Sequence, residues 1–194
     1  MDYKQEEFLS KQRALELWDS GDIDKIETGT FKGLAEIHRY IFQDVYSFAG
    51  EIRSVNIAKG NFRFAPVLYL EASIKEIEKM PQNTFEECVD KYVEMNVAHP
   101  FREGNGRSGR IWLDKMLKAA VGKCIDWSQI DKESYLSAME RSPVNSLEIK
   151  HLLSSALITD ISSREIYMKG IDNSYRYEDT NNVSIFDVDK FHIR

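Results

Sequence analysis

Most of this sequence repeats its apolar residues at intervals of three and four, which is the spacing of one face of an α-helix. The clearest example is the stretch 34–45, where apolar side chains and His38 recur at that spacing. The same pattern predicts helices at 4–19, 67–80, 84–98, 106–120, 132–141, 146–157 and 162–178. In the first helix we expect Phe8, Leu15 and Trp18 to form the buried side. The chain is therefore predicted to be all-α.

The helical pattern changes between Gly50 and Pro66. Residues 61–64 alternate polar and apolar side chains, as a half-buried strand does. Gly60-Asn61 suits a two-residue hairpin turn, because glycine takes positive φ at the first turn position. We expect one small β-hairpin, inserted between helices.

The end of the chain is read in two parts. Ser162-x-x-Glu165 has the form of a capping box, which predicts the start of the last helix. Gly170 is expected to interrupt or kink that helix, because glycine is a poor helix former. Residues 179–194 are polar and carry no strong pattern. The expected organisation is a single domain over 1–178 followed by a polar tail.

Composition narrows the class of protein. A chain of 194 residues, of which 42% are hydrophobic, can build a core without disulfides or a structural metal. Cys88 and Cys124 do not form a Cys-x-x-Cys pair, so we expect two reduced thiols. An acidic N-terminus and apolar runs well short of a bilayer span predict a cytoplasmic protein with no membrane partner. The net charge of −6 argues against direct nucleic-acid binding.

The chemistry-bearing residues gather in HPFREGNGRSGR, residues 99–110, between two predicted helices. Pro100 disfavours helix at His99 and so helps to end the first one. The glycines permit a tight loop, and the second helix begins at about Asn105 or Gly106. Free backbone N–H groups and the positive end of the dipole point outward at such a start, which favours phosphate binding.

Each polar residue of the stretch has an assignable role. Arg107 and Arg110 share a helix face, and their guanidinium groups suit phosphate oxygens. Glu103 can hold Mg²⁺, which binds through one or two carboxylates plus substrate phosphates. Asn105 can donate to an oxygen on the reacting phosphorus. His99 titrates near neutrality and can take a proton from an attacking hydroxyl.

Other interpretations of the stretch fit less well. Residues 104–109 spell G-x-G-x-x-G, but neither a βαβ unit nor the further motifs of a protein kinase accompany it. His99 and Glu103 are four apart like helical metal ligands, yet Pro100 and Gly104 oppose one continuous helix. Taken alone, His99 would be interpreted as a buried core histidine, and the arginines as part of a solvated face. A purely structural loop has no need of the whole group.

This stretch resembles the signature of the Fic family at every defining position, HPFxEGNGRxxR. Residues 46–53, YSFAGEIR, resemble the family's segment leading into its flap. The similarity runs from about residue 30 to 178. It implies a Fic-type helical domain in which the hairpin of residues 55–64 is the flap.

The resemblance implies a protein adenylyltransferase that uses ATP and Mg²⁺. A Tyr, Ser or Thr hydroxyl of a target protein attacks the α-phosphorus, and pyrophosphate leaves. The flap pairs with an extended segment of the target by strand addition. The implied site consists of His99 as general base, Glu103 as metal ligand, and Gly104, Asn105, Gly106, Arg107 and Arg110 around the nucleotide.

A second resemblance concerns Ser174 and Glu178, which are four apart and face the same way on a helix. Alone they would be a solvated face. Fic proteins carry an inhibitory helix with Ser-x-x-x-Glu followed by Gly or Asn, whereas Asp179 follows here. The resemblance implies that Glu178 pairs with Arg110 where the γ-phosphate should sit.

Several functions stay open at this point. We expect Tyr175 or Tyr177 to be self-modified in a way that weakens the inhibition. The alternatives are removal of AMP from a modified protein, with Glu178 positioning water, and a nucleotide-sensing module without turnover. A DNA-binding helix pair is disfavoured by the net charge. Assembly into a homo-oligomer could bury the inhibitory helix, but the oligomeric state cannot be read from the sequence.

Overall fold

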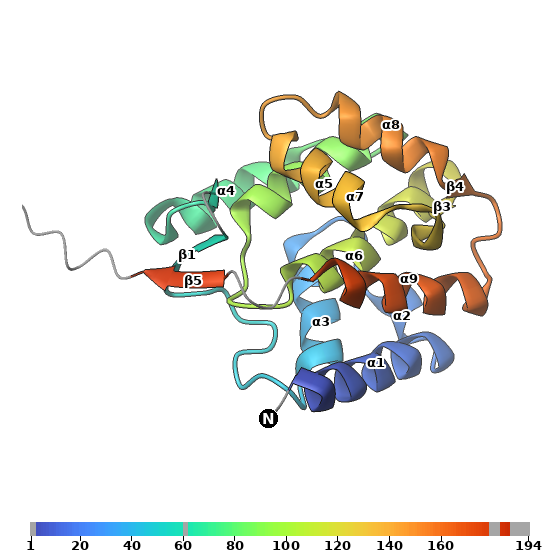
Figure 1. The fold of residues 1–194 in the computed structure, drawn as a ribbon, viewed down its shortest axis with the longest axis horizontal. Helices are drawn as coiled ribbons and strands as arrows, with labels where there is room; N and C mark the ends of the chain where they lie inside the picture. The colour runs from blue at the N-terminus through green and yellow to red at the C-terminus, as the bar shows by residue number, and fades with distance from the viewer. Residues whose placement is uncertain (1–2, 60–61, 179–182, 187–194) are drawn as a thin grey trace, which may run out of the picture.

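The computed structural model describes residues 3–59, 62–178 and 183–186 (Figure 1). Helices dominate it, as predicted. Their bounds are α1 (Tyr3–Asp19), α2 (Asp22–Lys25), α3 (Phe31–Phe42), α4 (Val67–Lys79), α5 (Phe85–Ala98), α6 (Asn105–Val121), α7 (Lys132–Arg141), α8 (Leu147–Ser155) and α9 (Arg164–Tyr177). A single 3₁₀ turn is assigned within the described part, at Trp127–Gln129.

Helix α6 lies at the centre of the molecule, in contact with α3, α5 and α9 (Figure 1). Its apolar face, which includes Trp112, Leu113, Met116 and Leu117, is fully buried. Helices α1 and α9 lie side by side and cover the opposite flank from α4. The first and last helices thus close over the start of the central one, which is where the phosphate-binding motif was predicted.

Two details of the helices differ from the sequence-based expectation. Phe8 is 67% exposed, and α1 buries Ser10, Ala14 and Leu17 instead, because it packs against α3 and α9 together. The N-cap of α9 is Ser163, whose hydroxyl accepts from the backbone of Ile166, rather than Ser162. These are errors of register of one or a few residues on correctly predicted helices.

Gly170 neither ends α9 nor divides it. A Cβ at this position would lie 3.1 Å from Cδ1 of the Trp127 ring. The glycine therefore serves close packing of α9 on the 3₁₀ turn at 127–129. The capping box at the start of α5 is complete, since Thr84 and Glu87 each accept from the other's backbone.

The predicted hairpin is present as β1 (Asn56–Lys59) and β2 (Phe62–Arg63), paired antiparallel with Lys59 opposite Phe62. Its predicted turn, Gly60-Asn61, lies outside the described residues, as does Asp179. A strand within the predicted tail, β5 (Val183–Phe186), pairs with the other edge of β1. A second antiparallel pair joins β3 (Cys124–Ile125), which follows α6, to β4 (Leu157–Ile158), which follows α8.

Two further expectations concern the cysteines and insertion into a membrane. Cys88 and Cys124 are buried free thiols, and burial raises the pKa of each to about 11. Among the described helices, none combines the length and the apolar character that crossing a bilayer requires.

Candidate active site

His99 ends α5 in the left-handed conformation, with φ 51°. Its Nδ1–H donates to the Asn96 carbonyl at 3.2 Å, which leaves the lone pair of Nε2 available as a base. The flap residue Phe64 stacks on the imidazole at a centroid distance of 3.6 Å. Burial by these neighbours lowers the pKa of His99 to about 3. The imidazole is therefore neutral at pH 7, as a general base must be.

Arg53 connects the flap to the His99 turn. Its buried guanidinium donates to the carbonyl oxygens of His99 at 2.7 Å, Val55 at 2.8 Å and Ala98 at 3.1 Å, and also to that of Ala65. The two ends of the hairpin and the end of α5 are thus fastened to one side chain. The sequence signal was present, because Arg53 closes the segment that resembles the approach to a Fic flap.

The loop between α5 and α6 is shaped by Asn105. Its amide oxygen accepts from the Phe101 backbone N–H and its amide nitrogen donates to the Phe101 carbonyl, each at 2.8 Å. The second N–H of the amide nitrogen takes no part in these two bonds, so the donation to phosphate predicted for Asn105 stays a prediction. Its role here is to fix the loop that carries Glu103.

His38 supports the same loop from α3, a role that sequence analysis missed. Its Nε2–H donates to the Glu103 carbonyl at 2.8 Å, and its Nδ1 accepts from the Gly50 backbone N–H at 2.9 Å. Burial lowers the pKa of His38 to about 4, so the ring stays neutral and keeps this tautomer. Its helical spacing marks it as buried, but nothing local reveals what it contacts.

Two glycines make room at the start of α6. Gly104 has φ 82°, and a Cβ there would lie 2.4 Å from the Phe42 ring. A Cβ at Gly106 would lie 2.5 Å from the Glu178 carboxylate and 2.9 Å from the Arg110 guanidinium. Only glycine leaves the helix start open where anionic oxygen approaches the two arginines.

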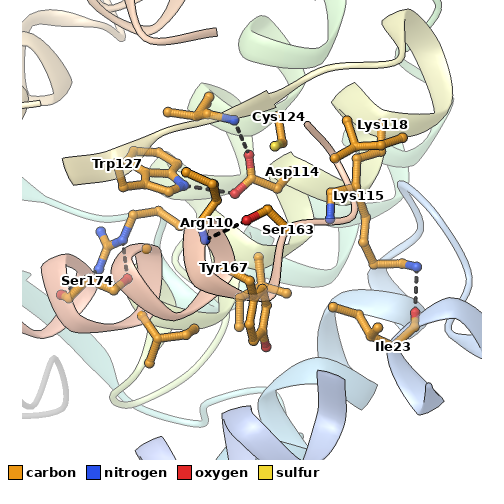
Figure 2. Close-up of a pocket in the computed structure, with 16 residues that line it drawn as sticks. Ile23, Arg110, Asp114, Lys115, Lys118, Cys124, Trp127, Ser163, Tyr167 and Ser174 are labelled. Atoms are coloured by element: carbon orange, nitrogen blue, oxygen red, sulfur yellow. Dashed lines mark hydrogen bonds between the residues drawn. The ribbon is translucent and has the colours of Figure 1, made fainter. Parts of the chain in front are cut away.

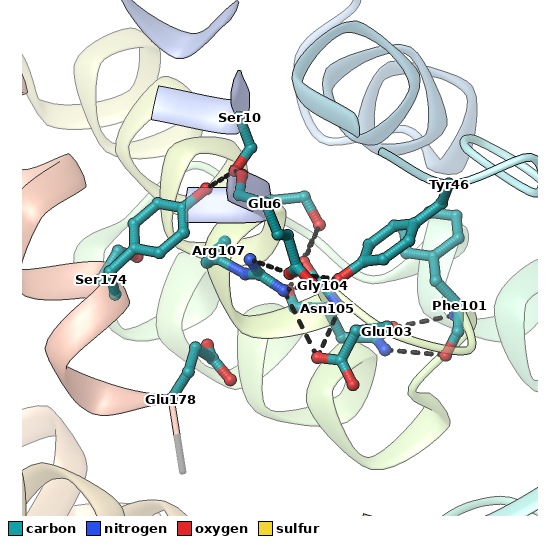
Figure 3. Close-up of polar contacts among 12 residues, drawn as sticks. Glu6, Ser10, Tyr46, Phe101, Glu103, Gly104, Asn105, Arg107, Ser174 and Glu178 are labelled. Carbon is teal, nitrogen blue, oxygen red and sulfur yellow. Dashed lines mark hydrogen bonds and ion pairs between the residues drawn. The ribbon is translucent and has the colours of Figure 1, made fainter. Parts of the chain in front are cut away.

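Arg107 is 4% exposed and is surrounded by acceptors from distant parts of the chain (Figure 3). Its Nη1 donates to Glu6 at 2.9 Å, and its Nη2 donates to the Tyr46 hydroxyl at 3.2 Å and to Glu103 at 3.4 Å. Its Nε is a buried nitrogen for which the described residues supply no hydrogen-bond partner. A donor of this kind fits an incoming anion.

Arg110 is equally buried, but its donors are engaged by α9 (Figure 2). Nε donates to the Ser174 hydroxyl, Nη2 donates to the Ser174 carbonyl at 3.0 Å, and Nη2 also donates to Glu178 at 2.8 Å. Nη1 lies 3.4 Å from the Tyr135 hydroxyl. The structure thus brings together all three residues of the predicted inhibitory contact.

The charge state of Glu178 follows from these neighbours. Burial by itself would raise the pKa of its carboxyl, but the charges of Arg110 and Arg107 outweigh burial and lower that pKa. Glu103 behaves oppositely, because burial dominates and raises its pKa. Glu178 is therefore a carboxylate at neutral pH, held at the place where a phosphate would meet Arg110.

These groups surround one cavity of about 420 Å³. The flap contributes Lys59, Phe62 and Phe64 to its wall. The remaining lining includes His99, Glu103, Asn105, Gly106, Arg110, Tyr135, Tyr177 and Glu178. Among the predicted residues, Gly104, Arg107 and Ser174 do not line this cavity, and the flap forms one side of it.

Tyr175 and Tyr177 lie within α9 and are buried. The Tyr175 hydroxyl hydrogen-bonds with the hydroxyl of Ser10. The Tyr177 hydroxyl donates toward the carbonyl oxygens of Trp127 and Ile130, at 2.9 and 2.7 Å. Self-modification of either residue stays a prediction, and it requires α9 to leave this position first.

Together, these features define a helical domain in which a glycine-flanked helix start and Arg110 lie beside a neutral imidazole, an arrangement that suits a phosphate-bearing ligand and a base for a neighbouring proton donor. Residues 29–117 match the model of the Fic/DOC family. The chain is 32% identical over 149 residues to "Probable protein adenylyltransferase y4lH" of Sinorhizobium fredii, a match covering 71% of this chain and 74% of that protein. On this evidence the chain belongs to the Fic/DOC family.

Two further comparisons agree with this assignment. "Protein adenylyltransferase VbhT" of Bartonella schoenbuchensis is 33% identical over 136 residues, covering 64% of this chain and 27% of that protein. The crystal structure of BepC from Bartonella tribocorum with bound AMPPNP superposes with a TM-score of 0.66 at 21% identity. That match covers 80% of this chain and 86% of BepC, and it shows that the fold is shared.

Proposed function

We propose that this chain is an auto-inhibited protein adenylyltransferase that transfers AMP from ATP to a Tyr, Ser or Thr hydroxyl of a target protein. The observation that carries the proposal is that neutral His99, Gly106 at the start of α6 and Arg110 line one cavity. Relatives named as protein adenylyltransferases support the reaction class.

The site residues account for the steps of the transfer. The target oxygen forms a bond to the α-phosphorus as its proton passes to Nε2 of His99. The bond from the α-phosphorus to the bridging oxygen of the β-phosphate breaks, and pyrophosphate leaves with that electron pair. The backbone N–H groups at the start of α6 face the developing negative charge. Asn105 and His38 keep the loop in place during these steps.

The site fits ATP through features of its own. Gly106 leaves open the space beside the Arg110 guanidinium and the Glu178 carboxylate, and both Gly106 and Arg110 line the cavity. Mg²⁺ fits as an ion bound by Glu103 together with the substrate phosphates. No group of three or more His, Cys, Asp or Glu residues in the described chain could hold a metal by itself. When bound, Mg²⁺ would neutralise phosphate charge.

The inhibition acts through Arg110. While Glu178 occupies its Nη2, the γ-phosphate has to sit elsewhere, and the α-phosphorus is then out of line with the target hydroxyl. Arg110 is buried and the Glu178 side chain is 18% exposed, so water screens their attraction less than it would at an open surface. We infer that ATP binds to this state but reacts slowly, and that the target docks as an extended segment along the flap, 55–64.

The test uses the Glu178→Gly variant with labelled ATP, Mg²⁺ and a cell lysate. Adding His99→Ala should lower label incorporation by about 10²–10⁴-fold, because the general base is lost. The matched control is His151→Ala, since His151 lies exposed on α8. Equal labelling with and without His99 would refute the assignment of the base.

Removal of AMP from a modified protein is the second candidate. Glu178 is ionised and lines the same cavity as His99, so it is positioned to orient a water. Incubating a pre-labelled target with the unmodified chain and with Glu178→Gln separates the two functions. Release of label that needs Glu178 would favour this second reaction.

A further inference from the structure

Strand β1 of the flap has both of its edges occupied. β2 covers one edge through Ala58 and Lys59, and β5 covers the other along the whole of β1 (Figure 1). The register of β5 pairs Phe186 with Asn56 and Val183 with Lys59. The chain's own C-terminal segment thus occupies a flap edge by the main-chain pairing that an extended target segment would use.

The register also decides what β5 offers to the site. Directly opposite residues of an antiparallel pair share a face of the sheet. Lys59 and Phe62 are opposite one another and both line the cavity that holds His99. Position 183 stands opposite Lys59, and position 185 stands opposite Ile57. Because residues two apart on a strand share a face, both positions lie on the face of the sheet that carries Lys59.

The residues at those two positions, Val183 and Ile185, have no hydroxyl group. The hydroxyl residue of the strand is Ser184, which stands opposite Ala58 at the alternate register position. We propose that β5 is a built-in pseudosubstrate: it docks on the flap as a target does, but it presents no acceptor at the register positions on the cavity face. This inference rests on the proposed function, since it assumes that targets bind at the flap.

The position of β5 in the chain makes such competition effective. Only residues 179–182 separate it from Glu178. A segment tethered this closely competes at an effective concentration of the order of millimolar. If β5 is paired in about nine molecules of ten, the apparent affinity for a target falls about tenfold. The same short connection links the occupied flap edge to the inhibitory helix α9.

The decisive test turns the pseudosubstrate into a substrate. Val183→Thr and Ile185→Thr, each in the Glu178→Gly background, add a hydroxyl while keeping a β-branched side chain. With ATP and Mg²⁺, mass spectrometry should find AMP on the introduced threonine of at least one variant, at a rate independent of protein concentration. Ser184 should stay unmodified in both. No AMP on either threonine, or AMP on Ser184, would overturn the proposal.

A second pair of variants tests release of the edge. Ser184→Pro and Ile185→Pro each remove a backbone N–H, and one of two adjacent residues in an antiparallel strand must donate to its neighbour. In the Glu178→Gly background, the variant that removes the N–H donated to β1 should raise labelling of lysate proteins about tenfold. Ile185→Val, the matched control, should not change it.

The proline substitution also serves as a control on the first test. Added to the Val183→Thr or Ile185→Thr chain that becomes labelled, Ser184→Pro should abolish the modification of the threonine. Absence of label on every protein, in the lysate as well as on this chain, would contradict the proposed transferase function. If lysate proteins are labelled but the introduced threonines carry no AMP, only the proposal that β5 is a pseudosubstrate would be contradicted.

Discussion

Arg107 and Arg110 lie one turn apart on α6, are equally buried, and each meets a carboxylate from one end of the chain. Glu6 of α1 pairs with Arg107, and Glu178 at the end of α9 pairs with Arg110. The two contacts differ in what they leave free. Arg107 keeps a buried Nε without a partner among the described residues, whereas donors on all three Arg110 nitrogens are already engaged.

This difference indicates how the two arginines respond to a triphosphate. Arg107 is not part of the cavity lining, and its guanidinium lies over the rings of Phe42 and Tyr175 while Glu6 and Tyr46 accept its hydrogen bonds. Phosphate reaches Arg110 only by displacing Glu178. Under the proposed function, Glu6 positions its arginine and Glu178 competes with phosphate for the other, although in both pairs a buried arginine meets a partly exposed carboxylate.

The helices that carry the two carboxylates are joined to one another. Lys11 of α1 pairs with Asp172 of α9 at 2.8 Å, and Arg164 of α9 pairs with Asp19 of α1 through two bonds of 2.7 and 2.9 Å. The Tyr167 hydroxyl also donates to the Ala14 carbonyl at 3.0 Å. Displacing Glu178 by a local change at the end of α9 therefore leaves the rest of α9 fastened to α1.

The largest effect should come from removing the competing carboxylate. We expect Glu178→Gly to raise AMP transfer on the order of a hundredfold, because it restores the placement of the α-phosphorus. Labelled AMP incorporation into lysate proteins measures it. Glu178→Gln should give a smaller increase, and Glu165→Gln, on the exposed start of the same helix, should give none. An unchanged rate in Glu178→Gly would contradict the proposal that Glu178 inhibits AMP transfer.

Arg110 itself should matter next. In the Glu178→Gly background, Arg110→Lys keeps the charge but loses the planar fork, so we expect transfer to fall about 10- to 100-fold for one lost charge-assisted contact of about 1.5–3 kcal/mol. Initial rates at saturating and limiting ATP measure the loss. A variant as active as its parent would show that Arg110 does not hold the reacting nucleotide.

Glu6→Gln should have a smaller effect in the opposite direction to Glu178→Gly. The amide can still accept from Arg107 and Tyr46, so we expect transfer to fall by less than about tenfold. Glu7→Gln is the matched control, because Glu7 is next in α1 and pairs with Lys11 at 2.7 Å. If Glu6→Gln instead raised activity, Arg107 would be inhibited in the same way as Arg110.

The smallest effect should be that of pH. Burial lowers the pKa of His99 to about 3, so the base is unprotonated above that value. Transfer by Glu178→Gly, relative to its value at pH 7, should change less than about twofold down to pH 5.5 as far as His99 decides it. A fall centred near pH 6.5, the usual value for histidine, would mean that burial does not affect the base.

The free energy of unfolding should also depend on pH through the lowered pKa of His99. His99 has a lower pKa folded than unfolded, so its contribution is complete above about pH 6.5 and is lost as pH falls toward 3. Urea unfolding of the intact chain and of His99→Ala at pH 7 and pH 5 measures this. The difference between the two chains should shrink at the lower pH, and an equal difference at both values would contradict the shift.

Sequence by itself determined the local elements of this protein. The three-and-four spacing predicted the main helices, and the alternation after Asn61 predicted the flap. The helices and the hairpin are confirmed, because their information lies within a few helical turns. The stretch 99–110 predicted an anion-binding helix start with His99 beside it, which stays a prediction, and the family resemblance led us to expect the contact of Glu178 with Arg110 that the structure contains.

Only the tertiary structure decided what comes from far along the chain. Glu6 reaches Arg107 across 101 residues, His38 reaches Glu103 across 65, and β5 returns to pair with β1. None of these partners has a local pattern, because a lone carboxylate, a histidine on an apolar face and four residues of a polar tail read alike in many proteins. Contacts between distant segments depend on how helices pack, and packing is a property of the whole chain rather than of any window of it.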